Sequence, residues 1–402
     1  MVKFAHLGDC HLGSWRQPEL QDLNFQCFQK AIDSCIDEKI DFILVAGDLF
    51  DSAYPPIEIL KQTFAEFRKI FDAGIKCYMI AGSHDYSVSG KTFLDVLEKA
   101  GFCEICKYEE IKDEENNTQE IILHSCNHKG FEIYGFPGKK SGLEIHDLKK
   151  IKVKESSNFR ILMLHTSLTE AIGNLPIESI SLKELPKAEY YALAHLHINF
   201  NKDFENRKAI YSGPIFPNSF QELEDLGGGS FYIIEVSGFV EAKKQEIRIK
   251  EVLPFNIEIK NALAATQQIL SEFEKQNLND KIVLLRLYGV IEQGTSADID
   301  YGKIKQYLDE KQAYSFLKNT HKLTTREEEK LETDIQITSS DMNKVEEALI
   351  EEYEGKNPDQ FNKYILPLIH ALDLKKQEDE KSVIFESRLL SELNKVLGLD
   401  LK

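Results

Sequence analysis

The sequence predicts an α/β protein with two packed sheets, and two observations carry that prediction. Strand and helix patterns alternate over residues 1–100, which is typical of parallel strands joined by helical crossovers. Strand patterns then dominate residues 118–253, which indicates a second sheet packed on the first. Because 402 residues exceed what one compact core usually holds, we expect further domains beyond these sheets.

Three strand patterns open the chain, and each is followed by a helix pattern. The strand patterns occupy residues 2–7, 42–46 and 76–80. The second of them is a continuous apolar run, as expected for a strand buried on both faces. The helix patterns, with apolar residues on one face, occupy residues 25–36, 55–67 and 90–97. We therefore expect three consecutive parallel strands with helical crossovers between them.

The second sheet is expected from a series of short strand patterns. They occupy residues 120–123, 131–134, 160–164, 190–194, 209–211, 230–236 and 246–252. A region in which strand patterns dominate in this way is typical of strands that share one sheet. We therefore assign residues 1–253 to one domain.

The remaining residues divide into a small module, a linker and a helical region. Residues 254–320 contain strand patterns at 255–259 and 281–287 and helix patterns at 262–273 and 304–308. Residues 321–340 are polar and acidic, which predicts a linker. Residues 341–402 contain amphipathic helix patterns at 345–353, 364–372 and 383–397.

Composition narrows the class of protein. An apolar fraction of 42% with 29% charged residues describes an ordinary globular chain. No stretch approaches the roughly 18 apolar residues of a membrane span, and the N-terminus lacks a secretory signal. All seven cysteines precede residue 127, and Cys103-x-x-Cys106 has no second pair at zinc-site spacing. We expect buried free thiols rather than a cysteine metal site, and a cytoplasmic location.

Polar side chains able to bind metals follow each of the first three strand patterns directly. They are Asp9 and His11, then Asp48 and Asp51, then Ser83, His84 and Asp85. The carboxyl ends of parallel strands meet at one edge of a sheet, where open α/β sheets build their sites. Glycines at 8, 47 and 82 allow sharp turns there. An isolated carboxylate is usually only solvated, but three clusters at three strand ends predict a shared site.

Histidines end two strand patterns in the second half. His165 directly follows the strand pattern at residues 160–164, and His195-x-His197 directly follows the one at residues 190–194. Residues i and i+2 of a strand point to the same side, so both imidazoles can face one site. A lone histidine is more often structural, as we expect of His 6, 124, 128, 146, 321 and 370. Mixed imidazole and carboxylate ligands suit two cations of Mn²⁺, Fe²⁺ or Zn²⁺.

The order of these five motifs resembles the calcineurin-like metallophosphoesterase superfamily. Residues 9–13, 47–51 and 211–214 are further similar to SbcD-type nucleases, members of the meiotic-recombination-eleven family that processes DNA double-strand breaks. The resemblance covers the chain firmly to about residue 220 and loosely afterwards. It implies an αββα sandwich, a capping domain over 254–320 and ATPase-binding helices within 341–402.

The resemblance also implies roles for individual residues. One divalent cation, expected to be Mn²⁺, would be held by Asp9, His11, Asp48 and His197. A second would be held by Asp48, Ser83, His165 and His195, so that Asp48 bridges the two. Water activated by both cations would attack the phosphodiester. His84 would donate a proton or hydrogen bond to the phosphate, and Asp85 would orient its imidazole.

The chain departs from the family pattern at three positions. Ser83 stands where the family usually has asparagine, which predicts a looser second cation. Asp51 replaces a histidine found in part of the family, although bacterial-type members also have an acid there. Ala194 replaces the glycine before His-x-His and adds a methyl group in a tight turn. None of these changes removes a carboxylate or histidine ligand, so we expect an active enzyme.

The implied partners are DNA, as duplex ends and single strands, an SMC-like coiled-coil ATPase of the SbcC type, and a second copy of the chain. A net charge of −18 conflicts with the basic footprint of most nucleic-acid binders. Bound cations or a basic partner could offset it. The basic cluster at Lys 139, 140, 149, 150, 152 and 154 is either a phosphate track or a solvated loop. The closing helices either dock on the ATPase or pack on their own domain.

The resemblance implies a nucleoid-associated exonuclease and endonuclease, and two other functions compete with it. One is a phosphoesterase acting on small phosphoesters or phosphoproteins. That enzyme would need neither the added module nor the helical region. The other is a non-catalytic scaffold that binds DNA ends, with its chemistry lost through Ser83.

Overall fold

The computed structural model describes residues 1–86, 92–113, 118–139, 144–154, 156–173, 177–325, 350, 353, 361–372, 374 and 382–397. By its contacts the chain forms two compact units. The first comprises Met1–Ile257, Thr266–Leu287 and Asp300–Thr320; the second comprises Glu258–Ala265, Tyr288–Ile299 and His321–Lys402. None of the described helices is long and apolar enough to cross a membrane. The domain boundaries drawn from the sequence remain predictions.

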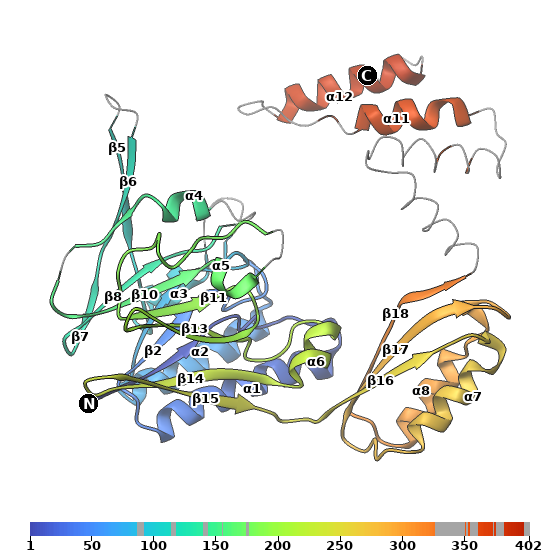
Figure 1. Ribbon diagram of the computed structural model, residues 1–402, viewed down its shortest axis with the longest axis horizontal. Helices are drawn as coiled ribbons and strands as arrows, with labels where there is room; N and C mark the ends of the chain where they lie inside the picture. Colours follow the sequence, from blue (N-terminus) through green and yellow to red (C-terminus); the bar gives the residue numbers. More distant parts are fainter. Residues whose placement is uncertain are drawn as a thin grey trace. The chain divides into compact units, whose positions relative to one another are not determined.

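The first sheet has six strands, and the three predicted N-terminal strands lie side by side within it. Its order is β15 (Val240–Ile247), β14 (Gly229–Val236), β1 (Val2–Leu7), β2 (Phe42–Ala46), β3 (Lys76–Ile80) and β4 (Glu104–Ile105). Strands β1 to β4 are parallel, and β14 pairs antiparallel with β1. This arrangement confirms the predicted β-α-β-α-β start and brings the carboxyl ends of β1, β2 and β3 to one edge (Figure 1).

Several strand assignments were wrong. We expected every strand after residue 118 in the second sheet, but β14 and β15 extend the first sheet, and β6 (Thr118–Leu123) belongs to a separate small sheet. We also expected a strand over residues 246–252, whereas β15 ends at Ile247 and β16 begins at Val252. The polar, exposed alternation of β15 gives little hydrophobic signal, which is why its start was missed.

Helices cover the outer face of the first sheet. These are α1 (Pro18–Asp37), α2 (Ile57–Asp72) and α3 (Leu94–Lys99). Proline at the start of α1 suits a first helical turn, whose N–H groups have no helical partner. Leu23, Phe28 and Ile32 of α1 and Phe67 of α2 lie in the core beneath them. The predicted start of the third helix at Gly90 lies outside the described residues.

The second sheet also has six strands. Its order is β12 (Asn199–Phe204), β13 (Arg207–Ser212), β11 (Tyr190–Ala194), β10 (Phe159–His165), β8 (Phe131–Phe136) and β7 (Cys126–His128). The four central strands are parallel, so the carboxyl ends of β10 and β11 also meet at one edge. Its outer face is covered by loops with the short helices α4 (Glu144–Leu148) and α5 (Thr169–Ile172). A small sheet of β5 (Tyr108–Asp113), β6 (Thr118–Leu123) and β9 (Ile151–Lys152) adjoins it.

An aromatic core joins the inner faces of the two sheets. The Phe4 ring of β1 stacks on Phe42 of β2 with centroids 4.8 Å apart. It also meets Tyr190 of β11 edge-on at 5.3 Å and Phe131 of β8 at 6.4 Å. Because all four rings are buried, this contact fixes one sheet against the other. The expected αββα sandwich is confirmed, with its second helical layer reduced to short helices and loops.

A three-stranded sheet follows the sandwich in the chain. It consists of β16 (Val252–Glu258), β17 (Ile282–Ile291) and β18 (Ser315–Thr325), accompanied by α7 (Ala262–Phe273), the 3₁₀ turn η2 (Ser296–Asp298) and α8 (Tyr301–Glu310). The predicted helix 262–273 is confirmed at both ends. Strand β18 was missed, and it occupies residues 321–325 of the predicted linker. The rest of that linker lies outside the described residues.

The last described residues form two helices. They are α11 (Ile365–Leu372), preceded by the 3₁₀ turn η3 (Asn362–Tyr364), and α12 (Ser382–Leu397). Both match predicted helices within one residue at each end. The predicted helix over 345–353 lies almost entirely outside the described residues. All seven cysteines are free thiols and six of them are buried, as expected.

The first testable prediction concerns the close approach of β1 and β11. A methyl group added at Gly8 would lie 2.6 Å from the Cβ of Ala194, and its next neighbour, Ser212 Oγ, would be an ordinary 3.4 Å away. The methyl group of Ala194 therefore occupies space that Gly8 leaves free. We expect Gly8→Ala to lower the free energy of unfolding by about 1–3 kcal/mol in urea titrations, because overpacking strains a close-packed core.

The reciprocal change provides the control for this prediction. The double variant Gly8→Ala with Ala194→Gly restores the original number of methyl groups and should recover most of the lost stability. Equal stability of Gly8→Ala and the native chain, or a double variant no better than the single one, would contradict this packing.

A second prediction concerns His6 of β1, which is buried and structural, as expected. Its Nδ1 lies 2.8 Å from the Tyr190 hydroxyl. Burial lowers the pKa of His6 from 6.5 to about 3. Because the folded state resists protonation, the stability from His6 is complete above the unfolded pKa and is lost as pH falls below it.

This pH dependence can be isolated with His6→Gln, whose amide can still bond to Tyr190 but does not titrate. Below a pH of about 6.5, the native chain should lose about 1.4 kcal/mol more per pH unit than this variant. Urea unfolding at a series of pH values measures the difference. Parallel pH profiles for the two proteins would show that His6 is not kept neutral by burial.

Candidate metal centre

The predicted metal-binding residues come together where strands of both sheets end. Asp9 and His11 follow β1, Asp48 follows β2, and Ser83 and His84 follow β3 in the first sheet. His165 is the last residue of β10, and His195 and His197 follow β11 in the second sheet. Since the aromatic core holds the two sheets face to face, both sets of strand ends face one another.

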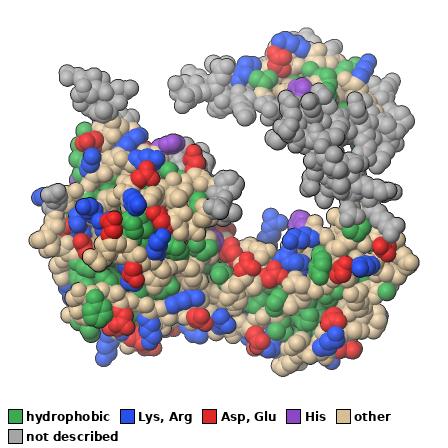
Figure 2. All heavy atoms as spheres, in the orientation of Figure 1, with side chains coloured by type: hydrophobic (Ala, Val, Ile, Leu, Met, Phe, Trp, Pro, Cys, Tyr) green, Lys and Arg blue, Asp and Glu red, His purple; other side chains and the backbone are tan. Residues whose placement is uncertain are grey.

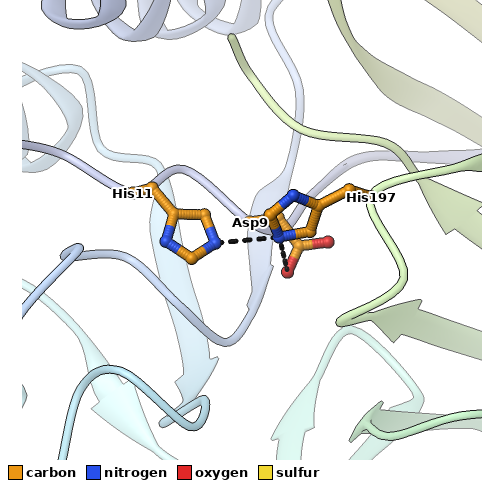
Figure 3. A group of neighbouring side chains, drawn as sticks. All are labelled: Asp9, His11 and His197. Atoms are coloured by element: carbon orange, nitrogen blue, oxygen red, sulfur yellow. Dashed lines mark hydrogen bonds and ion pairs between the residues drawn. The ribbon is translucent and has the colours of Figure 1, made fainter. Parts of the chain in front are cut away.

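Asp9, His11 and His197 form the first cluster, and Figure 3 shows these three side chains pointing toward one another. Nε2 of His11 lies 3.0 Å from Nε2 of His197. Nε2 of His197 lies 3.9 Å from Oδ1 of Asp9. The two imidazoles and the carboxylate therefore offer three ligand atoms to one point.

Asp48 is the centre of the second cluster. Its Oδ2 lies 3.1 Å from Nε2 of His165, 3.7 Å from Nε2 of His11 and 3.4 Å from the Ser83 hydroxyl. Its Oδ1 accepts a 2.7 Å hydrogen bond from the backbone N–H of His84. Asp48 thus lies between ligands from both sheets, which is the position expected of a bridging carboxylate.

His195 contributes to the same site in two ways. Its backbone N–H donates to both carboxylate oxygens of Asp9, at 2.9 and 3.0 Å. Its imidazole lies with its centroid 5.0 Å from that of His165. Burial and the neighbouring His165 lower the pKa of His195 to about 4, so its imidazole is neutral and able to bind a cation near neutral pH.

The backbone is strained where these ligands lie. Five of them have positive φ angles, a region that side chains other than glycine rarely adopt: Asp9 (48°), His11 (43°), Asp48 (51°), His195 (107°) and His197 (52°). Each costs about 1–2 kcal/mol, although Asp and His tolerate this region better than most residues. Such strain concentrated at one place indicates a functional site rather than a structural one.

Two glycines allow this close packing. A Cβ at Gly47, where φ is 98°, would lie 2.5 Å from Nδ1 of His165. A Cβ at Gly82 would collide with the carboxylate and backbone N of Asp48. The glycines in the loops after β2 and β3 are therefore required for Asp48 and His165 to meet.

Electrostatics at the site couple the carboxylates to the imidazoles. Burial disfavours the charge of Asp48, but His165 and His11 outweigh it and hold the pKa of Asp48 well below its usual range. Burial likewise disfavours charge on His165, but Asp48 and Asp9 raise its pKa to about 9. Burial opposes charge on His197 too, and Asp9 with Glu222 raises its pKa to about 9. The carboxylates thus attract positive charge to this point, which protons or metal cations can supply.

The contacts of the imidazoles show which of their ring nitrogens can bind a cation. Nδ1 of His165 lies 3.0 Å from the carbonyl oxygen of Ala46, and Nδ1 of His197 lies 3.1 Å from Oε2 of Glu222. Because these oxygens only accept, each Nδ1 keeps its proton, and each Nε2 becomes a ligand atom when a metal cation displaces the second proton of the ring. Nε2 of His165 is buried 3.1 Å from Oδ2 of Asp48, in a geometry that does not meet that of a hydrogen bond. Divalent cations fit these ring nitrogens and the adjacent carboxylates.

The expected role of Asp85 was wrong. Its carboxylate accepts hydrogen bonds from the backbone N–H groups of Leu49 (3.3 Å), Phe50 (3.0 Å) and Gly82 (2.9 Å). Nδ1 of His84 is instead 2.8 Å from the carbonyl oxygen of Asp51. Asp85 therefore ties the loop after β2 to the loop after β3, and the Asp51 backbone orients His84. Burial and the nearby charge of Asp48 raise the pKa of Asp85 to about 6.

Sequence reasoning missed Glu222, which lies in α6 (Phe220–Leu226), and Asn218, which lies just before this helix. Glu222 contacts His197, and the Asn218 amide donates to Oδ1 of Asp51 at 3.3 Å. That same oxygen of Asp51 lies 3.2 Å from Nδ1 of His11. The pattern Ser219-x-x-Glu222 is a helix N-terminus signal that could have located α6, but nothing in it indicates a contact with His197.

Comparison with known proteins agrees with this geometry. The family model described as calcineurin-like phosphoesterase matches residues 2–199. The DNA double-strand break repair protein Mre11 of Methanocaldococcus jannaschii is 28% identical over 76% of this chain and 77% of its own. That of Sulfolobus acidocaldarius is 26% identical over 94% of this chain and 97% of its own. An uncharacterized metallophosphoesterase of Bacillus subtilis, YhaO, is 25% identical over 77% of this chain and 76% of its own.

The match to the family model spans all five ligand motifs, from Asp9 to His197, and the part of the αββα sandwich from β1 to β11 that carries them. The chain is also similar over much of its length to proteins named for DNA double-strand-break repair. Residues 2–199 therefore form a metallophosphoesterase domain and belong to the calcineurin-like phosphoesterase family.

Proposed function

We propose that this protein is a metal-dependent DNA nuclease that processes double-strand breaks, acting as exonuclease on duplex ends and as endonuclease. The observation that carries the proposal is the meeting of carboxylate and imidazole ligands from five strand ends around Asp48. The similarity to proteins named DNA double-strand break repair protein Mre11 supports DNA as the substrate.

The proposed ligand sets follow the two clusters. Asp9, His11, Asp48 and His197 would hold one divalent cation, and Asp48, Ser83, His165 and His195 would hold the other. The 3.4 Å contact between the Ser83 hydroxyl and Asp48 supports Ser83 as a weak ligand. Mn²⁺ is the proposed ion, because mixed nitrogen and oxygen ligands without thiolates suit it. Bound cations would supply Lewis-acid activation of water and offset the charge of the phosphate.

His84 is the proposed proton donor or hydrogen-bond donor to the phosphodiester. Its side chain is 47% exposed, whereas the imidazole of His11, 4.8 Å away between centroids, is buried. With Nδ1 fixed on the carbonyl oxygen of Asp51, Nε2 is left to meet the phosphate or the leaving oxygen. Asp85 contributes indirectly, because it holds together the two loops that carry Asp48 and His84.

Phosphate contacts must compete with many acidic neighbours. Lys139 and Lys150 form ion pairs with Asp147 at 2.5 and 3.3 Å, and Lys149 pairs with Glu184 at 3.3 Å. Figure 2 shows acidic and basic side chains interspersed on the face that it draws. These pairs favour the solvated loop over a phosphate track for this cluster. We propose that a basic partner supplies much of the affinity for DNA.

The proposed partner is a coiled-coil ATPase of the SbcC type, bound through the C-terminal helices. Ile369 and Leu372 of α11 and Leu390 of α12 are exposed, although α11 and α12 contact one another. Exposed apolar side chains at helical spacing suit docking onto another helix. A homodimer, implied by the resemblance, completes the proposed assembly.

The test of the nuclease proposal is cleavage of end-labelled linear duplex DNA with Mn²⁺, with and without the ATPase and ATP. His84→Gln should lower the cleavage rate by about 10²-fold or more, because it removes the proton or hydrogen bond given to the phosphate. Mn²⁺ binding, measured by calorimetry, should stay within about threefold, since His84 is not a proposed ligand.

A surface histidine provides the matched control. His124 is 56% exposed and lies outside the site, so His124→Gln should cleave DNA at the native rate. Metal binding without cleavage by the native chain, even with the ATPase, would instead indicate a scaffold. Hydrolysis restricted to small phosphodiesters would indicate a small-substrate phosphoesterase.

A further inference from the structure

We propose that Glu222 is a positioning residue of the metal centre: its carboxylate fixes the ring of His197 so that Nε2 faces a divalent cation. The inference rests on the proposed function and deepens it, because it assigns a role to a residue outside the five ligand motifs. It is carried by the contacts of Glu222 and by the way α6 is held.

The first step is the contact between Glu222 and His197. Oε2 of Glu222 lies 3.1 Å from Nδ1 of His197, and the opposite nitrogen, Nε2, faces His11 at 3.0 Å. A carboxylate that accepts from Nδ1 fixes both the tautomer and the orientation of a metal-binding imidazole. With Nδ1 protonated, the lone pair of Nε2 is directed into the cluster with Asp9 and His11.

The second step is that the Glu222 carboxylate is itself held in place. Oε2 accepts a 2.8 Å hydrogen bond from the backbone N–H of Asn218, and Oε1 lies 3.3 Å from the Ser219 hydroxyl. The backbone N–H of Glu222 donates in return to Ser219 Oγ at 3.2 Å, which caps α6. Glu222 is therefore restrained to few rotamers, as a positioning group requires.

The third step is the anchoring of α6. Arg286 of β17 donates to Glu224 at 3.1 Å and to Gln221 at 2.8 Å, and its guanidinium lies 5.0 Å from the ring centroid of Phe220. The side chains of Arg286 and Glu224 are only 13% and 14% exposed, so this ion pair is better shielded from water than a surface pair. It restrains the helix that carries Glu222.

The same segment steadies a second imidazole. Asn218 donates to Oδ1 of Asp51, and this oxygen lies 3.2 Å from Nδ1 of His11. Nδ1 of His11 and Nδ1 of His197 therefore each face a carboxylate. Both rings present Nε2 to the same point, and the two nitrogens lie 3.0 Å apart. A proton held between them or a bound cation satisfies both nitrogens, and Glu222 helps to keep the ring of His197 in this orientation.

Calorimetric titration of the metal-free, full-length chain with Mn²⁺ tests the inference. Glu222→Ala should weaken one of two binding events by about 10–100-fold and leave the other within about threefold, because His197 belongs to one ligand set. Glu222→Gln should lose less, since its amide oxygen can still accept from Nδ1. The matched control, Asp225→Ala, removes an exposed carboxylate of the same helix that bonds to Gln221, and should bind both ions normally.

Several outcomes would overturn the role of Glu222. One is unchanged affinity at both sites in Glu222→Ala. Another is an equal loss at both sites together with a lower thermal midpoint of the metal-free protein, which would indicate a general structural role. A native chain that binds two ions but leaves DNA intact would refute the nuclease proposal alone. A native chain that binds no Mn²⁺ would overturn both.

Discussion

Mutual attraction between buried carboxylates and imidazoles is the interaction on which the site depends. Asp9, Asp48 and Asp85 are all buried within a few residues of strand ends, and like charges at such places repel strongly. His11, His165 and His197 surround the first two carboxylates and offset that repulsion. The protein keeps this arrangement although five of the ligands adopt strained backbone conformations. Binding of divalent cations gives a physical reason for retaining so costly a cluster.

Much of the fold could be predicted because its strands are buried on both faces. The limits of β2, β3 and β11 match the predicted apolar runs, since such runs follow from burial alone. The prediction failed where that signal is weak. Exposed charged residues alternate with half-buried ones along most of β15, and no residue of β18 beyond Leu317 is fully buried. Which sheet β14 joins depends on pairing with β1, a contact between distant residues that local patterns do not encode.

The proposed metal ligands could be predicted from the sequence for a similar reason. Asp9, Asp48, His165 and His197 lie at or beside strand ends, so strand prediction alone brings each pair to the carboxyl edge of its own sheet. The contacts of residues that hold the ligands in place could not be predicted from the sequence. Asp85 directly follows His84 in the sequence, which suggested a contact between the two side chains. Its carboxylate instead accepts hydrogen bonds from three backbone N–H groups. Glu222 reaches His197 from a helix that starts more than 20 residues later. Both contacts depend on loop conformation rather than on spacing.

The central claim is that ligands from both sheets converge on a pair of divalent cations. Anomalous X-ray diffraction from crystals of the full-length chain grown with Mn²⁺ tests it most directly. The account predicts two peaks about 3.5–4 Å apart, with Asp48 between them and ligand atoms at about 2.0–2.3 Å. Peaks located elsewhere on the protein, or no peak beside Asp48 at saturating Mn²⁺, would contradict it.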